Sequence, residues 1–461
     1  MLQTAYTSTA NIVSLMLDKN GFGPLGYLSI GTIYISWGLG SFLSPTIYKR
    51  WGSRFSIFIG TFSNSTWIYS SIITLNKRHQ DSSQHLWYQT DAFVYTVVLM
   101  NSVFNGFCNG PMWVAICKQI ASYSSKETYG LYFSYFWVFY ISSQIFGNSI
   151  AAYVLSNFSQ LAFFAIMGTL ALVAAFYFCF LTYEDDERRQ RQQQVGSSNL
   201  EARENLLIEN NQPEQSVLED VKDVFKMIGH PKMRYLIPQI FYTGVSIAFY
   251  TGLFVTFIFK TLPSYYSESE QFSKSMSVMS LIGLGALFGT ILIGYTYDKF
   301  GHKPASIQNI VILLVVALFV FAFGETREYN YQVFMMTLTW GMMDSSMATH
   351  CYSSLGIEFN DNPVGYALYN LFQSLAVLIF QMIHINIKGW DIFQTYSIFI
   401  LILGYIFFTI SYFMPNSKGP QLQKTFEDEV THGGALHVIE GHSLVHQHQI
   451  NVNDDQYIKQ Q

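Results

Sequence analysis

The sequence predicts an all-α membrane protein in which twelve transmembrane helices form two pseudo-symmetric six-helix halves. Three observations lead to this prediction: too little charge for a soluble protein, a succession of apolar stretches, and a segment that occurs once in each half. Of the 461 residues, 50% are hydrophobic and 12% are charged, whereas an ordinary soluble domain carries about 25% charged residues. This shortage of charge excludes an ordinary soluble globule and a disordered chain.

Eleven stretches approach or exceed the roughly 20 residues that a helix needs to cross a bilayer. Taken in order, they lie at 24–48, 55–75, 92–115, 129–153, 161–182, 235–260, 273–297, 305–325, 330–356, 362–386 and 391–413. Residues 1–19 carry a shorter and more polar stretch, which we interpret as the C-terminal part of a truncated first helix. Many stretches contain Ser, Thr, Asn, Gln and Tyr, as is typical of helices that face one another or an aqueous cavity.

Two hydrophilic segments divide the chain. We predict an N-terminal six-helix half at 1–182, a largely disordered linker at 183–234, a C-terminal six-helix half at 235–413 and a His-rich polar tail at 414–461. Basic residues flank the linker on both sides, and such residues favour the cytoplasmic side of a membrane. The linker and the tail are therefore predicted to be cytoplasmic, while the plasma membrane and an endomembrane both stay open as the compartment.

Charge and motif content narrow the functional classes. Lys plus Arg number 25 and Asp plus Glu number 30, a balance that gives no reason to expect nucleic acid as a partner. The four cysteines lack CxxC spacing, which argues against a zinc site or a disulfide scaffold. We find no P-loop, nucleophile elbow, paired catalytic carboxylates or metalloprotease helix. The sequence therefore predicts a protein that is not an enzyme, with no catalytic residues, no metal and no cofactor.

A repeat relates the two halves. The segment GTILIGYTYDKFGHK at 289–303 matches GSFLSPTIYKRWGSR at 40–54, and each lies at the end of the second predicted helix of its half. The match pairs three positions of the first copy, Arg50, Gly52 and Arg54, with three of the second, Lys299, Gly301 and Lys303. A repeated half is how many transporter folds are built, with a cavity between the halves.

The second copy fits the pattern G-x-x-x-D-[RK]-x-G-[RKH]-[RK], which resembles the loop motif of the major facilitator superfamily. Its residues are Gly294, Asp298, Lys299, Gly301 and Lys303. Gly301 permits a turn conformation that a Cβ atom would disfavour, and Asp298 is suited to charge-assisted hydrogen bonds between helix ends. We predict a cytoplasmic gate, in which Arg50, Gly52 and Arg54 form the degenerate first copy. A solvated turn that carries only orienting charges remains the alternative.

The membrane region also resembles one branch of that superfamily, the uncoordinated-ninety-three (Unc-ninety-three-like) family. The resemblance is carried by TANIVS at 9–14, GFGPLGYLSIGTIYISWGLGSFLSPTI at 21–47, GFCNGPMW at 106–113, YGLYFSYFWVFYISSQIFGNSI at 129–150, GMMDSSMATHCYSSLG at 341–356 and GYALYNLFQSL at 365–375. It implies the major facilitator fold. It also implies a role as regulatory subunit or trafficking partner of a channel or receptor, because characterised relatives act in this way.

Three departures from the family pattern concern the first helix and two polar motifs. The family has a longer first helix than the one at 1–19. It has a Gln-Gly pair where this chain has Ile116 and Cys117, and an Asn-Thr-Gln where this chain has Ala348, Thr349 and His350. Ligand contacts that those family amides make are therefore not expected at these positions.

Polar residues inside the predicted helices are functional candidates, because an ionisable group in the bilayer centre costs about 2.5–3.5 kcal/mol on insertion scales. Asp344 is the one deep acid, and His350 follows it after about 240° of net helix rotation, so we expect the two to face different directions. The remaining candidates for a cavity are neutral amides: Asn109, Gln144, Asn148 and Gln373. An interhelical hydrogen bond would also explain each of these amides, and we favour that interpretation for any single residue.

Two functions follow from these observations. The first is a non-enzymatic regulator or trafficking partner of an ion channel or receptor, which the family resemblance implies. The alternative is a secondary transporter of a solute or ion, working by alternating access, which the repeat and the Asp298 loop favour. The lipid bilayer is a partner in both. A sealed, apolar interface between the halves would count against transport.

Overall fold

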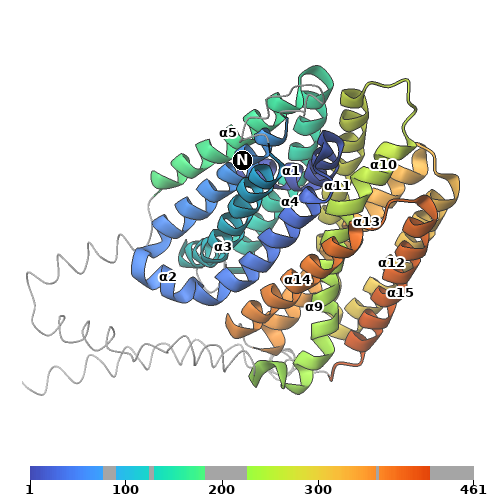
Figure 1. The fold of residues 1–461 in the computed structure, drawn as a ribbon. Coiled ribbons are helices and arrows are strands. Elements are labelled where there is room, and N and C mark those ends of the chain that lie inside the picture. Colours follow the sequence, from blue (N-terminus) through green and yellow to red (C-terminus); the bar gives the residue numbers. More distant parts are fainter. Residues whose placement is uncertain (76–89, 124–128, 182–225, 360–362, 416–461) are drawn as a thin grey trace, which may run out of the picture. The chain divides into compact units, whose positions relative to one another are not determined.

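The computed structural model describes residues 1–75, 90–123, 129–181, 226–359 and 363–415, which are almost wholly helical and contain no strand. The described helices belong to one compact unit, Met1–Met414. The tail beyond residue 415 and the linker up to residue 225 lie outside the described residues. Figure 1 shows the helices of the two halves side by side.

The N-terminal half contains six helical segments. Helix α1 (Leu2–Leu17) continues into a π-helical turn, Asp18–Phe22. Helix α2 (Leu25–Ser70) contains two segments that meet at a kink at Gly52, and a 3₁₀ turn, Ser71–Leu75, follows it. The half is completed by α3 (Asp91–Tyr123), α4 (Tyr129–Asn157) and α5 (Gln160–Cys179).

The C-terminal half repeats this plan. Its first segment is α9 (Pro231–Phe249), which passes through a π-helical turn, Tyr250–Phe254, into α10 (Val255–Thr261). Five helices follow: α11 (Glu268–Phe300), α12 (His302–Thr326), α13 (Tyr331–Glu358), α14 (Pro363–His384) and α15 (Trp390–Tyr412). The described residues thus contain six segments in each half, and the predicted all-α fold of two six-helix halves is confirmed.

Local sequence explains where several helices begin. Ser267 and Glu270 form a reciprocal capping box at the start of α11, and the Ser159 hydroxyl accepts the Ala162 N–H at the start of α5. The Asn330 side chain accepts the Gln332 N–H at the start of α13. Pro231 occupies the first turn of α9, where its missing N–H leaves no helical bond unmade.

The two copies of the repeated segment share one backbone conformation. Gly52 has φ 79° and ψ 178° between the two segments of α2, and Gly301 has φ 82° and ψ −168° between α11 and α12. These torsions belong to a region that is almost exclusive to glycine. The predicted pairing of Gly52 with Gly301 therefore has a physical basis in the turn. We call the end of the bundle that holds both glycines the motif end.

The halves meet mainly along two helix pairs, α4 with α11 and α2 with α14, and α1 also contacts the turn Tyr250–Phe254 and α10. Polar atoms join both pairs. The Asn148 side chain donates to the Met279 carbonyl at 2.9 Å, Ser149 and Ser280 share a hydrogen bond of 3.3 Å, and Asn370 donates to the Ser41 hydroxyl at 3.4 Å. The interface between the halves is therefore not the sealed apolar contact that would count against transport.

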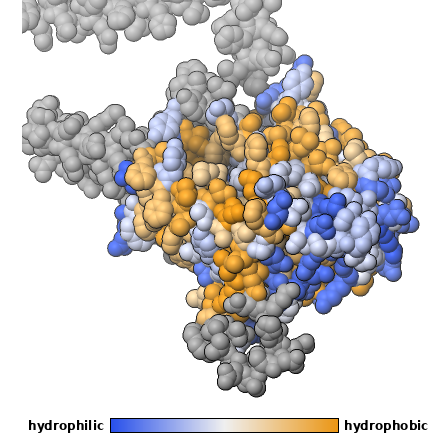
Figure 2. Space-filling model, turned by 90° about the horizontal axis from the view of Figure 1, so that it is seen from above, coloured by the Kyte–Doolittle hydropathy of each residue, from blue (hydrophilic) through white to orange (hydrophobic). Residues whose placement is uncertain are grey.

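The outer surface of the bundle is rich in exposed large hydrophobic side chains, as expected for contact with lipid. Phe146, Phe176, Ile291 and Leu318 are each more than half exposed. Figure 2 shows hydrophobic residues spread widely over one face, with hydrophilic residues gathered at parts of its margin. Seven of the described helical segments are long and apolar enough to cross a membrane by length and composition alone.

Candidate functional site

Asp344 lies halfway along α13, close to residues of both halves. Asp344 lies near the Ser246 hydroxyl of α9, and the Trp340 indole Nε1 donates to that hydroxyl at 3.0 Å. Asp344 forms no ion pair with any residue that the structure describes, and the other Asp, Glu, Lys and Arg of the described helices lie within about two turns of a helix end or of the Gly52 kink. Asp344 is thus an isolated deep acid.

Tyrosines from both halves surround this carboxylate. Tyr34 of α2 and Tyr140 of α4 come from the N-terminal half and lie within electrostatic range of Asp344. Those that the C-terminal half contributes are Tyr242, Tyr250 and Tyr369. Asp344 nevertheless keeps part of its surface exposed. Its neighbours therefore belong to both halves of the bundle.

A row of aromatic rings crosses from one half to the other. Trp37 and Trp113 stack with centroids 6.1 Å apart, and Trp113 stacks on Trp137 at 6.4 Å. The Trp137 ring of α4 then contacts the Tyr352 ring of α13 at 5.8 Å. All four rings are partly exposed although they lie inside the bundle, as side chains that line an internal space do.

Three polar atoms in this region are buried without a partner. The Gln144 Oε1 atom, the Trp37 Nε1 atom and the Tyr242 hydroxyl form no hydrogen bond with any described residue. Such atoms are costly in a protein interior unless a ligand or water satisfies them. We call the group of Tyr34, Trp37, Tyr140, Gln144, Tyr250 and Asp344 the central site.

Gln373, another predicted cavity residue, lies on α14 and is partly exposed. Its Nε2 atom donates to the Thr243 hydroxyl and to the Tyr369 hydroxyl, both at 3.0 Å. Because Tyr369 itself lies within electrostatic range of Asp344, Gln373 belongs to the surroundings of the central site.

His350 lies elsewhere, inside the C-terminal half. Its Nε2 atom is 2.9 Å from Nδ1 of His302, the first residue of α12, and both side chains are buried. His302 Nε2 is 2.8 Å from the Ser411 carbonyl, which accepts only, so His302 carries its hydrogen there and accepts at Nδ1. His350 therefore donates from Nε2, and its Nδ1 accepts from Asn309 at 2.9 Å and Gln239 at 3.1 Å. The structure thus separates His350 from Asp344.

Asn109 takes part in a closed ring of three buried asparagines that joins α2 to α3. Asn64 donates to Asn109 at 3.1 Å, Asn109 donates to Asn105 at 2.6 Å, and Asn105 donates back to Asn64 at 3.1 Å. Asn148 is also buried, where it accepts from Asn11 of α1 while donating to Met279. Both residues therefore act as interhelical hydrogen-bonding groups in this structure.

The predicted gate residues gather at the motif end. Asp298 is exposed and forms no hydrogen bond or ion pair with a described residue. The Lys299 ammonium donates to the Tyr295 hydroxyl at 3.0 Å, and the Lys303 ammonium lies 6.0 Å from the centre of the Tyr412 ring.

In the first copy, the Arg50 guanidinium lies over the Trp51 ring at 5.5 Å, and Arg54 donates to the Leu181 carbonyl at 3.3 Å. At the motif end, Lys232 and Glu358 form an ion pair within the C-terminal half. None of these contacts joins one half to the other. The gate therefore remains a prediction about a different arrangement of the two halves.

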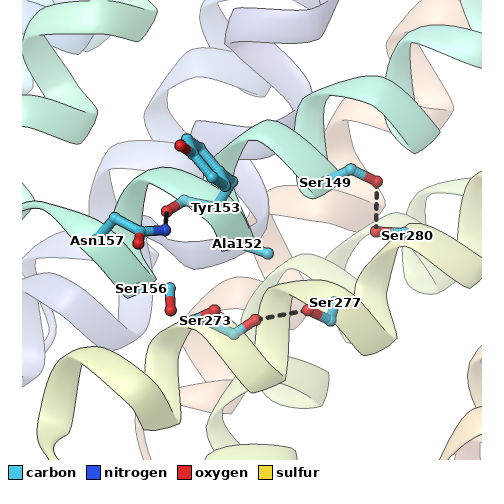
Figure 3. A pocket seen from close by; sticks show the side chains of 8 residues that line it. All are labelled: Ser149, Ala152, Tyr153, Ser156, Asn157, Ser273, Ser277 and Ser280. Atoms are coloured by element: carbon cyan, nitrogen blue, oxygen red, sulfur yellow. Dashed lines mark hydrogen bonds between the residues drawn. The ribbon is translucent and has the colours of Figure 1, made fainter.

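A serine-lined cavity of about 460 Å³ lies between α4 and α11, away from the motif end. Figure 3 shows α4 contributing Ser149, Tyr153 and Asn157 to one wall and α11 contributing serines to the other. The Asn157 side-chain amide donates a hydrogen bond to the Tyr153 carbonyl at 2.9 Å. The cavity thus opens along the seam between the halves.

The sequence interpretation missed the tyrosines of the central site, and it did not foresee His302 as the partner of His350. Tyrosine is abundant in this chain, with 31 residues, so its presence in a helix carries little signal. His302 looked like a variable position of the loop motif. A search for a second buried histidine near the motif would have singled it out. In the described regions, no group of three His, Cys, Asp or Glu residues is placed to hold a metal ion.

Comparisons with known proteins agree with this architecture. A family model described as Major Facilitator Superfamily matches residues 86–381. UNC93-like protein MFSD11 of Xenopus tropicalis is 24% identical over 446 residues, which cover 89% of this chain and 92% of that protein. The same protein of Xenopus laevis is 22% identical over 444 residues, with the same coverage.

Solved structures are similar at the level of the fold. The D-xylose-proton symporter superposes with a TM-score of 0.64 at 15% identity, covering 91% of this chain and 96% of its own. The nucleoside transporter NupG superposes with a TM-score of 0.61 at 13% identity, covering 89% and 96%. A bacterial homologue of the iron transporter ferroportin gives a TM-score of 0.58 at 12% identity, covering 89% and 95%.

Proposed function

Because this chain belongs to the major facilitator superfamily, in its UNC93-like branch, we propose that it is a secondary transporter that works by alternating access. The observation that carries the proposal is the central site. An isolated deep acid, with exposed surface, lies among aromatic and amide side chains from both halves. A ligand held there would contact both halves at once, so their relative movement would expose it to each side of the membrane in turn.

The polar seams between the halves support the same proposal. The hydrogen bonds across the α4–α11 and α2–α14 contacts are formed by neutral groups, such as Ser149 with Ser280 and Asn370 with Ser41. Contacts of this kind contribute little energy each and can re-form in a second arrangement. The Asp298 loop would then act as the cytoplasmic gate when its end of the bundle closes, and the linker and tail would lie on that cytoplasmic side.

The first function that the sequence implied, a regulator or trafficking partner of a channel or receptor, is the competing proposal. The UNC93-like resemblance favours it, but none of the contacts described here identifies a partner surface. Transport would need no partner protein, whereas regulation would need one. The two proposals are therefore distinguished by the activity of the purified chain alone.

The test uses the full chain, purified and reconstituted into liposomes. We expect time-dependent uptake of at least one member of a panel of labelled solutes: a sugar, a nucleoside, an organic cation, an organic anion and potassium. Asp344→Asn should abolish that uptake, and Glu328→Gln, which removes an exposed acid between α12 and α13, should leave it unchanged. Absence of flux for the whole panel, together with co-purification of a channel from native membranes, would overturn transport in favour of regulation.

A further inference from the structure

We propose that the central site binds a monovalent organic cation, an ammonium group attached to an apolar or aromatic body. This inference rests on the proposed function, because it names the substrate class of the same site. Its starting point is the unbalanced charge of the site. Asp344 has two carboxylate oxygens, and its neighbour Ser246 offers them one neutral hydroxyl.

The Ser246 hydroxyl has a single hydrogen to donate, and its oxygen accepts the Trp340 indole N–H at 3.0 Å. No described Lys, Arg or His forms an ion pair with Asp344. A charged carboxylate in such a place is unfavourable until an opposite charge arrives. A bound cation supplies that charge, and the carboxylate then gains the hydrogen bonds that its second oxygen lacks.

The walls of the site suit the rest of such a ligand. Tyr34, Tyr140 and Tyr250 lie within electrostatic range of Asp344, and Tyr34 contacts the Trp37 ring, which stacks on Trp113. Aromatic rings attract cations through the negative potential of their faces, most strongly when water is excluded. The same rings provide an apolar surface for the body of the ligand.

Other ligand classes fit this site less well. An anion would need Lys or Arg, and every described Lys and Arg residue lies within about two turns of a helix end or of the Gly52 kink. A divalent metal ion would need several carboxylate or histidine ligands, whereas Asp344 is isolated. A sugar would leave the charge of Asp344 unbalanced, because its hydroxyls are neutral. The unpartnered Gln144 Oε1 and Trp37 Nε1 atoms are suited to orient a small polar group beside the ammonium.

The test is a binding measurement on the purified full chain in detergent, read by calorimetry and by quenching of tryptophan fluorescence. Phenethylammonium is the cationic probe, 2-phenylethanol is its neutral counterpart, and 3-phenylpropionate is the anionic one. We expect phenethylammonium to bind at least about ten-fold more tightly than either counterpart. Asp344→Asn should remove this preference, Asp344→Glu should retain most of it, and Glu328→Gln should leave it intact.

Two results would overturn the inference: equal affinity for the cationic and neutral probes, or a preference that survives in Asp344→Asn. Tighter binding of potassium than of phenethylammonium would also overturn it, because the site would then select an inorganic ion. Thermal unfolding of each variant shows whether it is folded. If Asp344→Asn does not fold, loss of the cation preference in a folded Asp344→Glu variant would contradict the inference. Cation binding without uptake of any solute would contradict the proposed transport alone. Uptake of a sugar or an anion without cation binding would contradict this inference alone.

Discussion

Gly301 shows how a single residue sets the geometry of the repeated segment. Its φ of 82° and ψ of −168° lie where a side chain is strained, although no atom lies within 4 Å of the position that a Cβ would take. Gly301→Ala therefore tests backbone conformation and not space. We expect a loss of about 1–3 kcal/mol in the free energy of unfolding, measured by thermal or denaturant unfolding in detergent.

Gly294→Ala is the matched control for that substitution. Gly294 belongs to the same motif and also has open space around its Cβ position, but it lies within α11 with an ordinary helical backbone. Replacing it with Ala should be neutral or stabilising by up to about 1 kcal/mol. A result in which both variants lose the same stability would show that the backbone at Gly301 is not the cause.

The ring of Asn64, Asn105 and Asn109 leads to a second prediction at this scale. Asn105→Ala leaves the Asn64 Oδ1 and the Asn109 Nδ2 without their ring partners in a buried place. The expected loss of unfolding free energy is about 1–3 kcal/mol. Asn101→Ala provides the comparison, because the Asn101 amide bonds only the Val97 carbonyl of its own helix, and its loss should be much smaller. Equal losses would contradict a role for the ring.

Residue identity alone could predict only part of the site. Asp344 stood out because an acid in an apolar stretch is rare, and this signal needs no structure. The amides gave no such signal: Asn109 is bonded within its own half, Asn148 bridges the halves, and Gln144 faces the central site, yet all three look alike in the sequence. Their differences come from which helix lies opposite, and a periodic pattern does not contain that information.

At the scale of helices, α11 and α13 approach so closely that glycines replace side chains. A Cβ on Gly285 would lie 1.9 Å from the Leu338 carbonyl oxygen of α13. Because that neighbour is backbone, Gly285→Val should push the two helices apart, and we expect a loss of about 3 kcal/mol in detergent unfolding. Gly294→Val, on the same helix in open space, should cost far less. Similar losses in the two variants would mean that β-branching in α11, and not the close contact, determines the effect.

Hydrophobic stretches predicted the helices well, because the bilayer requires both length and apolar character. What they did not predict are the irregular turns. The π-helical turns Asp18–Phe22 and Tyr250–Phe254 lie at or within helices whose sequence pattern continues across them. A single extra residue per turn changes which side chains face inward, yet it leaves hydropathy unchanged, so tertiary packing must select it.

At the scale of the whole molecule, alternating access predicts that fixing one seam between the halves stops transport. Ser149 and Ser280 face each other across α4 and α11 with hydroxyl oxygens 3.3 Å apart (Figure 3). Ser149→Cys combined with Ser280→Cys should form a disulfide on mild oxidation. We expect uptake in liposomes to fall to background when the disulfide forms and to recover on reduction.

Each single cysteine variant is the control for that experiment, since neither can bridge the seam. The exposed Cys117 is replaced by serine in all of them to avoid unintended pairs. Full uptake by the cross-linked protein would contradict movement of α4 against α11. The repeat predicted that the halves are related, but not which helices join them, because the pairing of α2 with α14 and of α4 with α11 depends on contacts far apart in sequence.

The row of hydrogen bonds through His350 and His302 has one more consequence. Every hydrogen in it points the same way, from the Asn309 and Gln239 amides toward the Ser411 carbonyl. A carbonyl oxygen cannot release a proton onward, and neither amide supplies one at the other end. The row from the two amides through the two imidazoles to the Ser411 carbonyl therefore has no proton donor at one end and no group that can pass a proton on at the other. Among the described residues, Asp344 is therefore a better candidate for carrying a proton through the membrane than this histidine pair.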